Sequence, residues 1–278
     1  MSKNIFICAS DLAVITGDNP YKDISEIILK YWKKHYKDSY LNCVANLTKS
    51  NKPIKKEETH FETINRISKE NNLNIQGDLT KCLKTSTIND LNTNKNTIFE
   101  KTLSKLNDKQ KKEFTDSINR ATNTNFGIKY ENKGVELYKE ITNSNVNFDR
   151  KYHKKELFEI EYDDIIDVWC LGGKIDGIAI KNDDRKILEI KNRVNRLFNC
   201  VRDYEKVQCY AYMYLLDIPA TDLAETLKAD QSTMNINTIN FEEDYWNNHI
   251  EIKIEVFVDD FYNFLEDPLR QYELLSDN

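Results

Sequence analysis

Hydrophobic and polar positions follow two different periods along this chain, and each period predicts a different kind of element. Residues 24–36 have the 3-and-4 spacing of a helix with one buried face, and helical spacing recurs at 121–145 and 201–216. Residues 156–192 instead contain three runs typical of strands: ELFEIEYDD, VWCLGGKIDGIAI and KILEIKN. NINTINFEED predicts a later strand, and the C-terminal segment is a strand or helix followed by a closing helix. Strands flanked by helices predict a mixed α/β core.

The remaining segments predict turns and a helical insertion. Ser10 or Asp11 is expected to cap a short helix, and residues 17–20, GDNP, mark a turn. Residues 46–120 are rich in Asn, Lys, Thr and Ser, with apolar positions that suggest two helices. We interpret 46–120 as a helical insertion with loops inside one domain that spans residues 1–278, rather than as a separate enzyme domain.

The segment KIDGIAIKNDDRKILEIKN predicts a β-hairpin whose turn lies in KNDDR. If the two aspartates of that turn straddle its centre, Asp176 lies opposite Lys191 and Ile178 lies opposite Glu189. Residues two apart on a strand share a face, so Asp176, Glu189 and Lys191 project together. The two acidic residues would be a diagonal pair about 7–8 Å apart at the backbone. An odd change of register would separate them. The alternative interpretation is a solvent-exposed hairpin face.

Two carboxylates and a lysine on one face suit metal-assisted phosphodiester hydrolysis. Carboxylates and a backbone carbonyl are ligands for hard cations such as Mg²⁺ or Mn²⁺. Such an ion lowers the pKa of a bound water and stabilises charge on a phosphate. A lysine two residues after Glu189 can position the attacking water or neutralise the phosphate.

Two predicted helices carry polar residues in their apolar stripes. Glu131 lies in the stripe of the 121–145 helix, where a charge is costly unless it is paired or binds a metal. Gln208 lies on the apolar face of the 201–216 helix, one turn before Tyr212. Each also has an ordinary interpretation: Glu131 at the exposed edge of its stripe, and Gln208 as a core amide with satisfied hydrogen bonds.

Composition narrows the classes of protein without selecting one. A net charge of −6 argues mildly against a protein that coats DNA unaided, but not against a DNA enzyme. No apolar run approaches the ~20 residues that cross a bilayer, and the N-terminus does not resemble a signal peptide, so we expect an intracellular, cytoplasmic protein that does not bind membranes. None of the six cysteines forms CxxC, so we expect free thiols and neither zinc nor iron–sulfur sites.

Together these residues resemble the PD-(D/E)xK nuclease superfamily, and more closely its lambda exonuclease and YqaJ-like viral recombinase branch. The branch pattern is a helix with a WG-x-x-YE-like motif, then S-x-DG, LExK and Q-x-x-x-(Y/W). The opening ICASDLAVITGDNPY is also similar to the YqaJ opening, so the resemblance covers residues 1–30 and 121–216. The matching motifs, in the same order, are FGIKYEN (Phe126–Asn132), KIDG (Lys174–Gly177), LEIK (Leu188–Lys191) and QCYAY (Gln208–Tyr212).

The resemblance implies a restriction-endonuclease-like α/β fold, with a mixed central sheet flanked by helices. It implies that Asp176 and Glu189 bind one or two Mg²⁺ or Mn²⁺ ions, with the carbonyl of Ile190 as a further ligand. By the same resemblance, Glu131 would hold a second ion or a water bound to it.

The resemblance also implies roles for the residues that surround the metal. Lys191 would assist the attacking water, Gln208 would orient Lys191 or the scissile phosphate, and Tyr212 would support Gln208. Members of this branch degrade linear double-stranded DNA from the 5′ end in recombination or repair, and they often work with a single-strand-annealing protein. A viral source and a homo-oligomer follow from the same likeness, although the insertion argues against a ring that threads DNA.

The chain departs from the family where the terminal phosphate would bind. Lys174 replaces the usual serine two positions before the aspartate, and Lys3 replaces the N-terminal arginine, while Ser10 is kept. We therefore expect a basic phosphate pocket made by these three residues with Arg193 and Arg196.

Two other functions stay open. The same core could be a structure- or sequence-selective endonuclease if 46–120 blocks threading. The chain could also be a catalytically silent DNA-binding recombination partner, against which the intact Asp176, Glu189 and Lys191 argue.

Overall fold

The computed structural model describes residues 2–50, 58–85, 87–148, 151–193, 196–227 and 230–276, apart from the side chains of 126–129 and 230–231. The first four side chains of the FGIKYEN motif thus lie outside the described residues, although their backbone is helical. Within the described ranges, no helix is long and apolar enough to cross a membrane.

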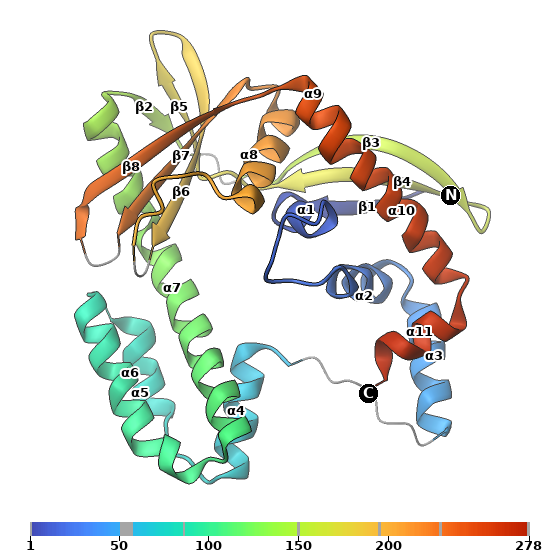
Figure 1. The fold of residues 1–278 in the computed structure, drawn as a ribbon, viewed down its shortest axis with the longest axis horizontal. Helices are drawn as coiled ribbons and strands as arrows, with labels where there is room; N and C mark the ends of the chain where they lie inside the picture. Colours follow the sequence, from blue (N-terminus) through green and yellow to red (C-terminus); the bar gives the residue numbers. More distant parts are fainter. Residues whose placement is uncertain are drawn as a thin grey trace.

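The strands form two mixed sheets that lie next to each other (Figure 1). The first has the order β1-β4-β3, with β1 parallel to β4. The second has the order β2-β5-β6-β7-β8, with β6 parallel to β7 and the other pairs antiparallel. The strands are β1 (Ser2–Cys8), β2 (Asn145–Asn147), β3 (His153–Tyr162), β4 (Ile165–Gly173), β5 (Gly177–Lys181), β6 (Asp184–Arg193), β7 (Ala220–Leu227) and β8 (Asp230–Asn240).

The mixed α/β class is confirmed, but the interpretation of VWCLGGKIDGIAI as one strand is wrong. The chain leaves β4 after Gly173 and enters β5 at Gly177, so it changes sheet between them. Gly173 allows close packing at this break, because a Cβ there would lie 2.8 Å from the Tyr212 ring and 3.1 Å from the Cβ of Ala9. Asp176 therefore lies at the junction of the two sheets, not inside a strand.

Helices cover the sheets and enclose a main core in which Trp32, Trp169 and Phe261 are fully buried. The C-terminal segment, for which the sequence allowed either a strand or a helix, forms η2 and α10, which pack against this core. The helices are α1 (Ala9–Ile15), α2 (Ile24–His35), α3 (Lys37–Lys49), α4 (His60–Glu70), α5 (Gln76–Lys84), α6 (Ile88–Thr102), η1 (Leu103–Lys105), α7 (Asp108–Thr142), α8 (Asp203–Leu216), α9 (Glu243–Tyr245), η2 (Trp246–Glu251), α10 (Ile252–Leu265) and α11 (Pro268–Leu275).

Two local expectations need correction. Ser10 and Asp11 do not cap α1, because β1 runs up to Cys8 and this cysteine occupies the N-cap position. The strand β7 was not expected from its sequence, ATDLAETL. Seven of its eight residues are buried, so it lacks the alternation that marks a half-exposed strand.

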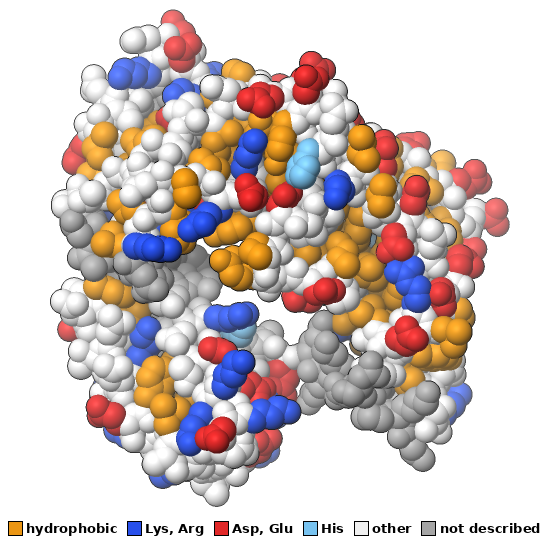
Figure 2. All heavy atoms as spheres, in the orientation of Figure 1, with side chains coloured by type: hydrophobic (Ala, Val, Ile, Leu, Met, Phe, Trp, Pro, Cys, Tyr) orange, Lys and Arg blue, Asp and Glu red, His pale blue; other side chains and the backbone are white. Residues whose placement is uncertain are grey.

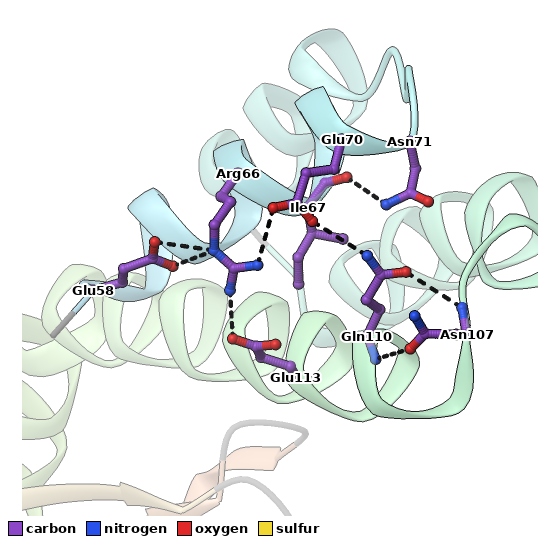
Figure 3. Close-up of polar contacts among 8 residues, drawn as sticks. All are labelled: Glu58, Arg66, Ile67, Glu70, Asn71, Asn107, Gln110 and Glu113. Atoms are coloured by element: carbon purple, nitrogen blue, oxygen red, sulfur yellow. Dashed lines mark hydrogen bonds and ion pairs between the residues drawn. The ribbon is translucent and has the colours of Figure 1, made fainter. Parts of the chain in front are cut away.

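Helices α4, α5, α6 and the first part of α7 surround a second hydrophobic core (Figure 1). Arg66 connects α4 to α7, because its guanidinium donates to Glu58 at 2.7 Å and to Glu113 at 2.5 Å (Figure 3). Between α3 and α7 the described residues form three α-helices, α4, α5 and α6, where the pattern of 46–120 suggested two. The 35 residues of α7 continue from this bundle to the five-stranded sheet.

Candidate active site

The hairpin β5–β6 forms as predicted, but its register differs by two residues. Ile178 lies opposite Ile187 rather than Glu189. The reason is the turn, which uses Asn182 and Asp183 with φ angles of 50° and 69°. Positive φ at both central residues is typical of a two-residue hairpin turn. An even shift keeps every side chain on its face, so the predicted acidic and basic residues still project together.

Asp176 faces both the hairpin and α7. Its Oδ2 accepts a hydrogen bond from the backbone N–H of Ile190 at 2.7 Å, which ties the sheet junction to β6. Its carboxyl group also shares a hydrogen bond with the carboxyl of Glu131. Burial, and then the contact with Glu131, raises the pKa of Asp176 to about 7. Two carboxyl groups in contact share a proton, so this pair is poised to exchange that proton for a cation.

Glu131 reaches the site because α7 passes very close to β6. A Cβ on Gly134 would lie 2.7 Å from Cγ2 of Ile190, so only glycine permits this approach. Glu131 is one turn earlier on the same helix and is half-buried. The ordinary interpretation of an exposed glutamate does not hold for this residue.

Glu189 and Lys191 form a buried ion pair beside this carboxyl pair. Glu189 is 5% exposed, and Nζ of Lys191 lies 2.7 Å from its Oε1. Burial raises the pKa of Glu189 to about 7, although Lys191 opposes the shift, and Asp176 adds to it. Burial would lower the pKa of Lys191, but the adjacent Glu189 outweighs this and raises it. Lys191 is therefore a permanent cation at neutral pH.

Helix α8 completes the cluster with Gln208 and Tyr212. Oε1 of Gln208 accepts from Nζ of Lys191 at 3.1 Å, and its Nε2 donates to the hydroxyl of Tyr212 at 2.8 Å. The oxygen and the nitrogen of the Gln208 amide thus each have a partner, and the partner of the oxygen is Lys191. The predicted chain of contacts from the lysine to the tyrosine is present.

The structure divides the five residues of the expected phosphate pocket into two groups. Ser10, Lys174 and Arg196 are exposed. Lys3 instead lies in β1, where Nζ is 3.2 Å from Asp167 and 3.6 Å from the centroid of an aromatic ring. The guanidinium of Arg193 is also already paired, because it binds two buried carboxylates. The exposed three remain available for a phosphate.

Two functional candidates were missed by sequence reasoning, namely the carboxylates that bind Arg193. Glu205 lies on α8 and is 2% exposed, and Glu225 lies on β7 and is 0% exposed. Glu205 could have been found, since it stands one turn before Gln208 on the same helix. Glu225 could not, because β7 itself was not expected.

The cluster offers carboxylate and carbonyl oxygens, the donors that Mg²⁺ and Mn²⁺ prefer. Asp176, Glu189, Glu131 and the carbonyl of Ile190 could supply them. Among the described residues, no three His, Cys, Asp or Glu side chains already surround a common point as metal ligands do. In this conformation Glu131 and Asp176 contact each other, and Glu189 is paired with Lys191.

Comparisons with known proteins add a family match. The sequence profile described as YqaJ-like viral recombinase domain matches residues 80–221. A search of curated proteins finds no match. An alkaline exonuclease from Laribacter hongkongensis aligns over 68% of this chain and 88% of its own, with 13% identity and a TM-score of 0.37. The structure of the same exonuclease in complex with dAMP aligns over 68% of this chain and 87% of its own, with 12% identity and a TM-score of 0.37. The protein SSO0001 aligns over 71% of this chain and 83% of its own, with 14% identity and a TM-score of 0.36.

Proposed function

The chain belongs to the family of YqaJ-like viral recombinase domains, and from this premise we propose that it is a divalent-metal-dependent nuclease that degrades linear double-stranded DNA from its ends. The observation that carries the proposal is the convergence of Asp176, Glu189 and Lys191 at one end of the hairpin, with Glu131 against them. More carboxylates than cations gather there, which is the arrangement that a divalent ion would complete.

The donor set fits Mg²⁺ or Mn²⁺ by its chemistry. Asp176, Glu189 and the carbonyl of Ile190 would hold one ion, and Glu131 would hold a second or support the first. When bound, such an ion activates water and stabilises negative charge on the phosphate. The contact between Asp176 and Glu131 supports this fit, because a pair of carboxyl groups held together by a proton is held equally well by a cation.

The remaining residues would orient the reactants. Lys191 would give its free N–H donor to the attacking water or to the scissile phosphate, since its ammonium has three donors and two are used. Gln208 would keep this ammonium in place, and Tyr212 would hold the amide of Gln208 in the orientation that accepts from it.

The charge distribution is compatible with DNA as the substrate. Residues 241–276 contain ten acidic and two basic residues, a local charge of −8 against −6 for the whole chain. The rest of the chain thus carries a small positive excess. Figure 2 shows Asp and Glu side chains gathered over α10 and α11. The net negative charge of this protein is therefore concentrated in the C-terminal helices and not spread over the β5–β6 hairpin.

The decisive experiment incubates the pure protein with linear and with covalently closed circular duplex DNA, in Mg²⁺ or in EDTA. The proposal expects digestion of the linear form only, in Mg²⁺ only. Nicking of the circle would instead select an endonuclease. No cleavage of either form in Mg²⁺ or Mn²⁺ would contradict the nuclease proposal.

Polarity requires a second measurement. Duplexes labelled at the 5′ or the 3′ end should release the 5′ label as mononucleotide at early times if degradation proceeds from the 5′ end. The remaining 3′ strand would then be the substrate of a single-strand-annealing protein in recombination or repair. Early release of the 3′ label would overturn that direction.

A further inference from the structure

A second buried charge cluster lies beside the catalytic one, and the proposed chemistry does not use it. Arg193 donates to the two oxygens of Glu205 at 2.6 and 2.8 Å, and its Nε donates to Glu225 at 2.6 Å. The side chain of Arg193 is 11% exposed. Since its guanidinium fork is filled by carboxylates, Arg193 does not serve as the phosphate ligand that its sequence suggests.

Glu225 also anchors the chain that leaves β6. Its Oε2 accepts from the backbone N–H groups of Phe198 at 3.1 Å and Asn199 at 3.3 Å, and from the amide of Asn235 at 3.4 Å. A fully buried carboxylate loses water on folding, so these donors are what compensates it. Residues 196–202 are therefore tied to β7 by one side chain.

The anchored segment carries two arginines. Arg196 is exposed, and Arg202 is half-buried with its guanidinium 4.2 Å from the centroid of the Phe198 ring. That ring also lies 4.4 Å from the guanidinium of Arg193. In the described part of the chain, neither Arg196 nor Arg202 forms an ion pair with an acidic side chain. Both cations are free to bind an anion.

The connectivity keeps this segment close to the catalytic lysine. Arg193 follows Lys191 by two residues of strand, or about 7 Å. Arg202 precedes Gln208 by six residues of helix, or about 9 Å along its axis. Because Gln208 contacts Lys191, the Arg202 end of the segment lies roughly three nucleotide steps from the catalytic lysine, at 3.4 Å per step of duplex.

We propose that residues 196–202 bind the backbone of the DNA strand next to the cleavage site, with Arg196 and Arg202 as phosphate ligands, and that Glu225 and Glu205 hold this segment through Arg193. This inference rests on the proposed nuclease function. In it, Glu225 is a positioning residue, because its partners are the segment, Arg193 and the amide of Asn235. Glu205 holds the same arginine from α8, one turn before Gln208.

The first experiment measures DNA binding in the Asp176→Asn background, where the substrate survives. A labelled 20-base-pair duplex is titrated at several salt concentrations. Arg196→Ala and Arg202→Ala should each weaken binding and lower the slope of log Kd against log salt by about one. Arg185→Ala is the matched control, since Arg185 is exposed at the opposite end of β6. It should bind like the parent protein.

The second experiment separates positioning from stability with Glu225→Gln, which keeps size but removes the charge that holds Arg193 and the two N–H groups. In the active protein it should raise KM for DNA roughly tenfold, the loss expected for one phosphate contact, and kcat should stay within about twofold of the wild-type value. Glu225→Asp retains the carboxylate and should recover part of the loss. The double variant Glu225→Gln/Arg202→Ala should be no worse than its more affected single variant, because both changes remove one contact.

The outcomes are distinguishable. Arg196→Ala and Arg202→Ala that bind like the Arg185→Ala control would overturn the assignment of the segment. Fully additive effects of Glu225→Gln and Arg202→Ala, or a Glu225→Gln variant that loses melting temperature and kcat with an unchanged KM, would overturn the positioning role. A wild-type protein that cleaves linear DNA in the same assays keeps the nuclease proposal intact in either case, and one that neither cleaves nor binds DNA removes its premise.

Discussion

The cluster around Asp167 in the three-stranded sheet and the cluster around Asp176 in the five-stranded sheet both place buried acidic residues near a lysine, and they differ in how the carboxylates are satisfied. In the three-stranded sheet, Asp167 is 0% exposed and lies 3.2 Å from Nζ of Lys3. The hydroxyl of Tyr262 donates to it at 2.7 Å, and the hydroxyl of Tyr36 donates to the same oxygen. One carboxylate therefore has two hydroxyl donors on one oxygen and an ion pair with a lysine at the other, which suits a structural anchor.

In the five-stranded sheet, carboxylates outnumber the cations that could pair with them. Lys191 faces Glu189, while Asp176 and Glu131 contact each other without a cation between them. Burial and the neighbouring carboxyls raise the pKa of Asp176 and of Glu189 to about 7. Carboxylates in excess at a buried position cost stability, which supports the proposal that a cation binds there. The balance of donors and acceptors is thus the difference between the proposed catalytic cluster and the cluster around Asp167.

The largest expected difference is between Asp176→Asn and Asp167→Asn. Asp176→Asn should lower the cleavage rate at least about 10³-fold, since a lost metal ligand removes several kcal/mol of transition-state stabilisation. Its melting temperature should stay equal or rise, because the substitution removes one of the crowded carboxylates. Asp167→Asn should instead lose about 1.5–3 kcal/mol of stability, the range for hydrogen bonds to a charged group.

Cleavage rates and thermal melts of the two variants test this contrast, with Asp167→Asn assayed well below its melting temperature. An Asp176→Asn protein that cleaves at the wild-type rate would refute the catalytic assignment. An Asp167→Asn protein that melts normally but does not cleave would show that the two clusters are not separate in function.

The same contrast shows what could be predicted from the sequence. Glu189 and Lys191 were predictable as a pair, because strand alternation places them on one face of β6, and Asp176, directly before β5, was predictable as their neighbour in every even register of the hairpin. Gln208 was predictable from helical spacing. Both inferences are local, since each depends on residues within one element or one hairpin.

Long-range partners were not predictable. Lys3 and Asp167 meet only because β1 pairs in parallel with β4, and neither that pairing nor β1 itself is visible in the local pattern. Arg193 looked like a phosphate ligand because nothing near it in sequence reveals Glu225, 32 residues away. The break between β4 and β5 was hidden for a similar reason, since Gly173 is required by the ring of Tyr212 on α8.

A smaller but still large effect is expected from comparing the two lysines. Lys191→Ala should lower kcat about 10²–10³-fold, as the loss of one preorganised donor at a developing charge does. Lys3→Ala should leave kcat within about twofold and lower the melting temperature, because its partner Asp167 keeps only the two tyrosine donors. Single-turnover rates with saturating enzyme measure the first effect free of DNA affinity. Equal losses of kcat in both variants would contradict the distinction.

The pH dependence tests the excess of carboxylates directly. Because the folded-state pKa values of Asp176 and Glu189 are raised to about 7 from ordinary values near 4, the folded metal-free protein binds more protons than the unfolded chain between pH 4 and 7. Its free energy of unfolding should therefore fall as pH rises through that range, by at most about 1.4 kcal/mol per pH unit for each proton. A cation competes with the same protons, so apparent Mg²⁺ affinity should increase up to about pH 7 and then level off.

Urea unfolding at several pH values, without metal and with Mg²⁺, measures both trends. Asp176→Asn should reduce the pH slope of the metal-free protein. A metal-free protein whose stability rises steadily from pH 4 to 7 would show that these carboxylates are not in excess.

The smallest expected effect concerns an exposed lysine, in contrast to the two buried ones. Lys174 lies at the sheet junction two residues before Asp176 and is exposed, so its ammonium is available to the terminal phosphate of a DNA end. Lys174→Ala should reduce the preference for 5′-phosphate over 5′-hydroxyl ends by a few-fold, because an exposed contact in water is worth about 1 kcal/mol or less. Lys253→Ala, exposed on the acidic helix α10, is the control. Competition between the two kinds of end in one reaction measures the ratio without depending on enzyme concentration. An equal loss on both ends would mean that Lys174 acts on the duplex as a whole. Of the three exposed residues of the expected phosphate pocket, Ser10 and Arg196 would then remain as candidates for binding the terminal phosphate.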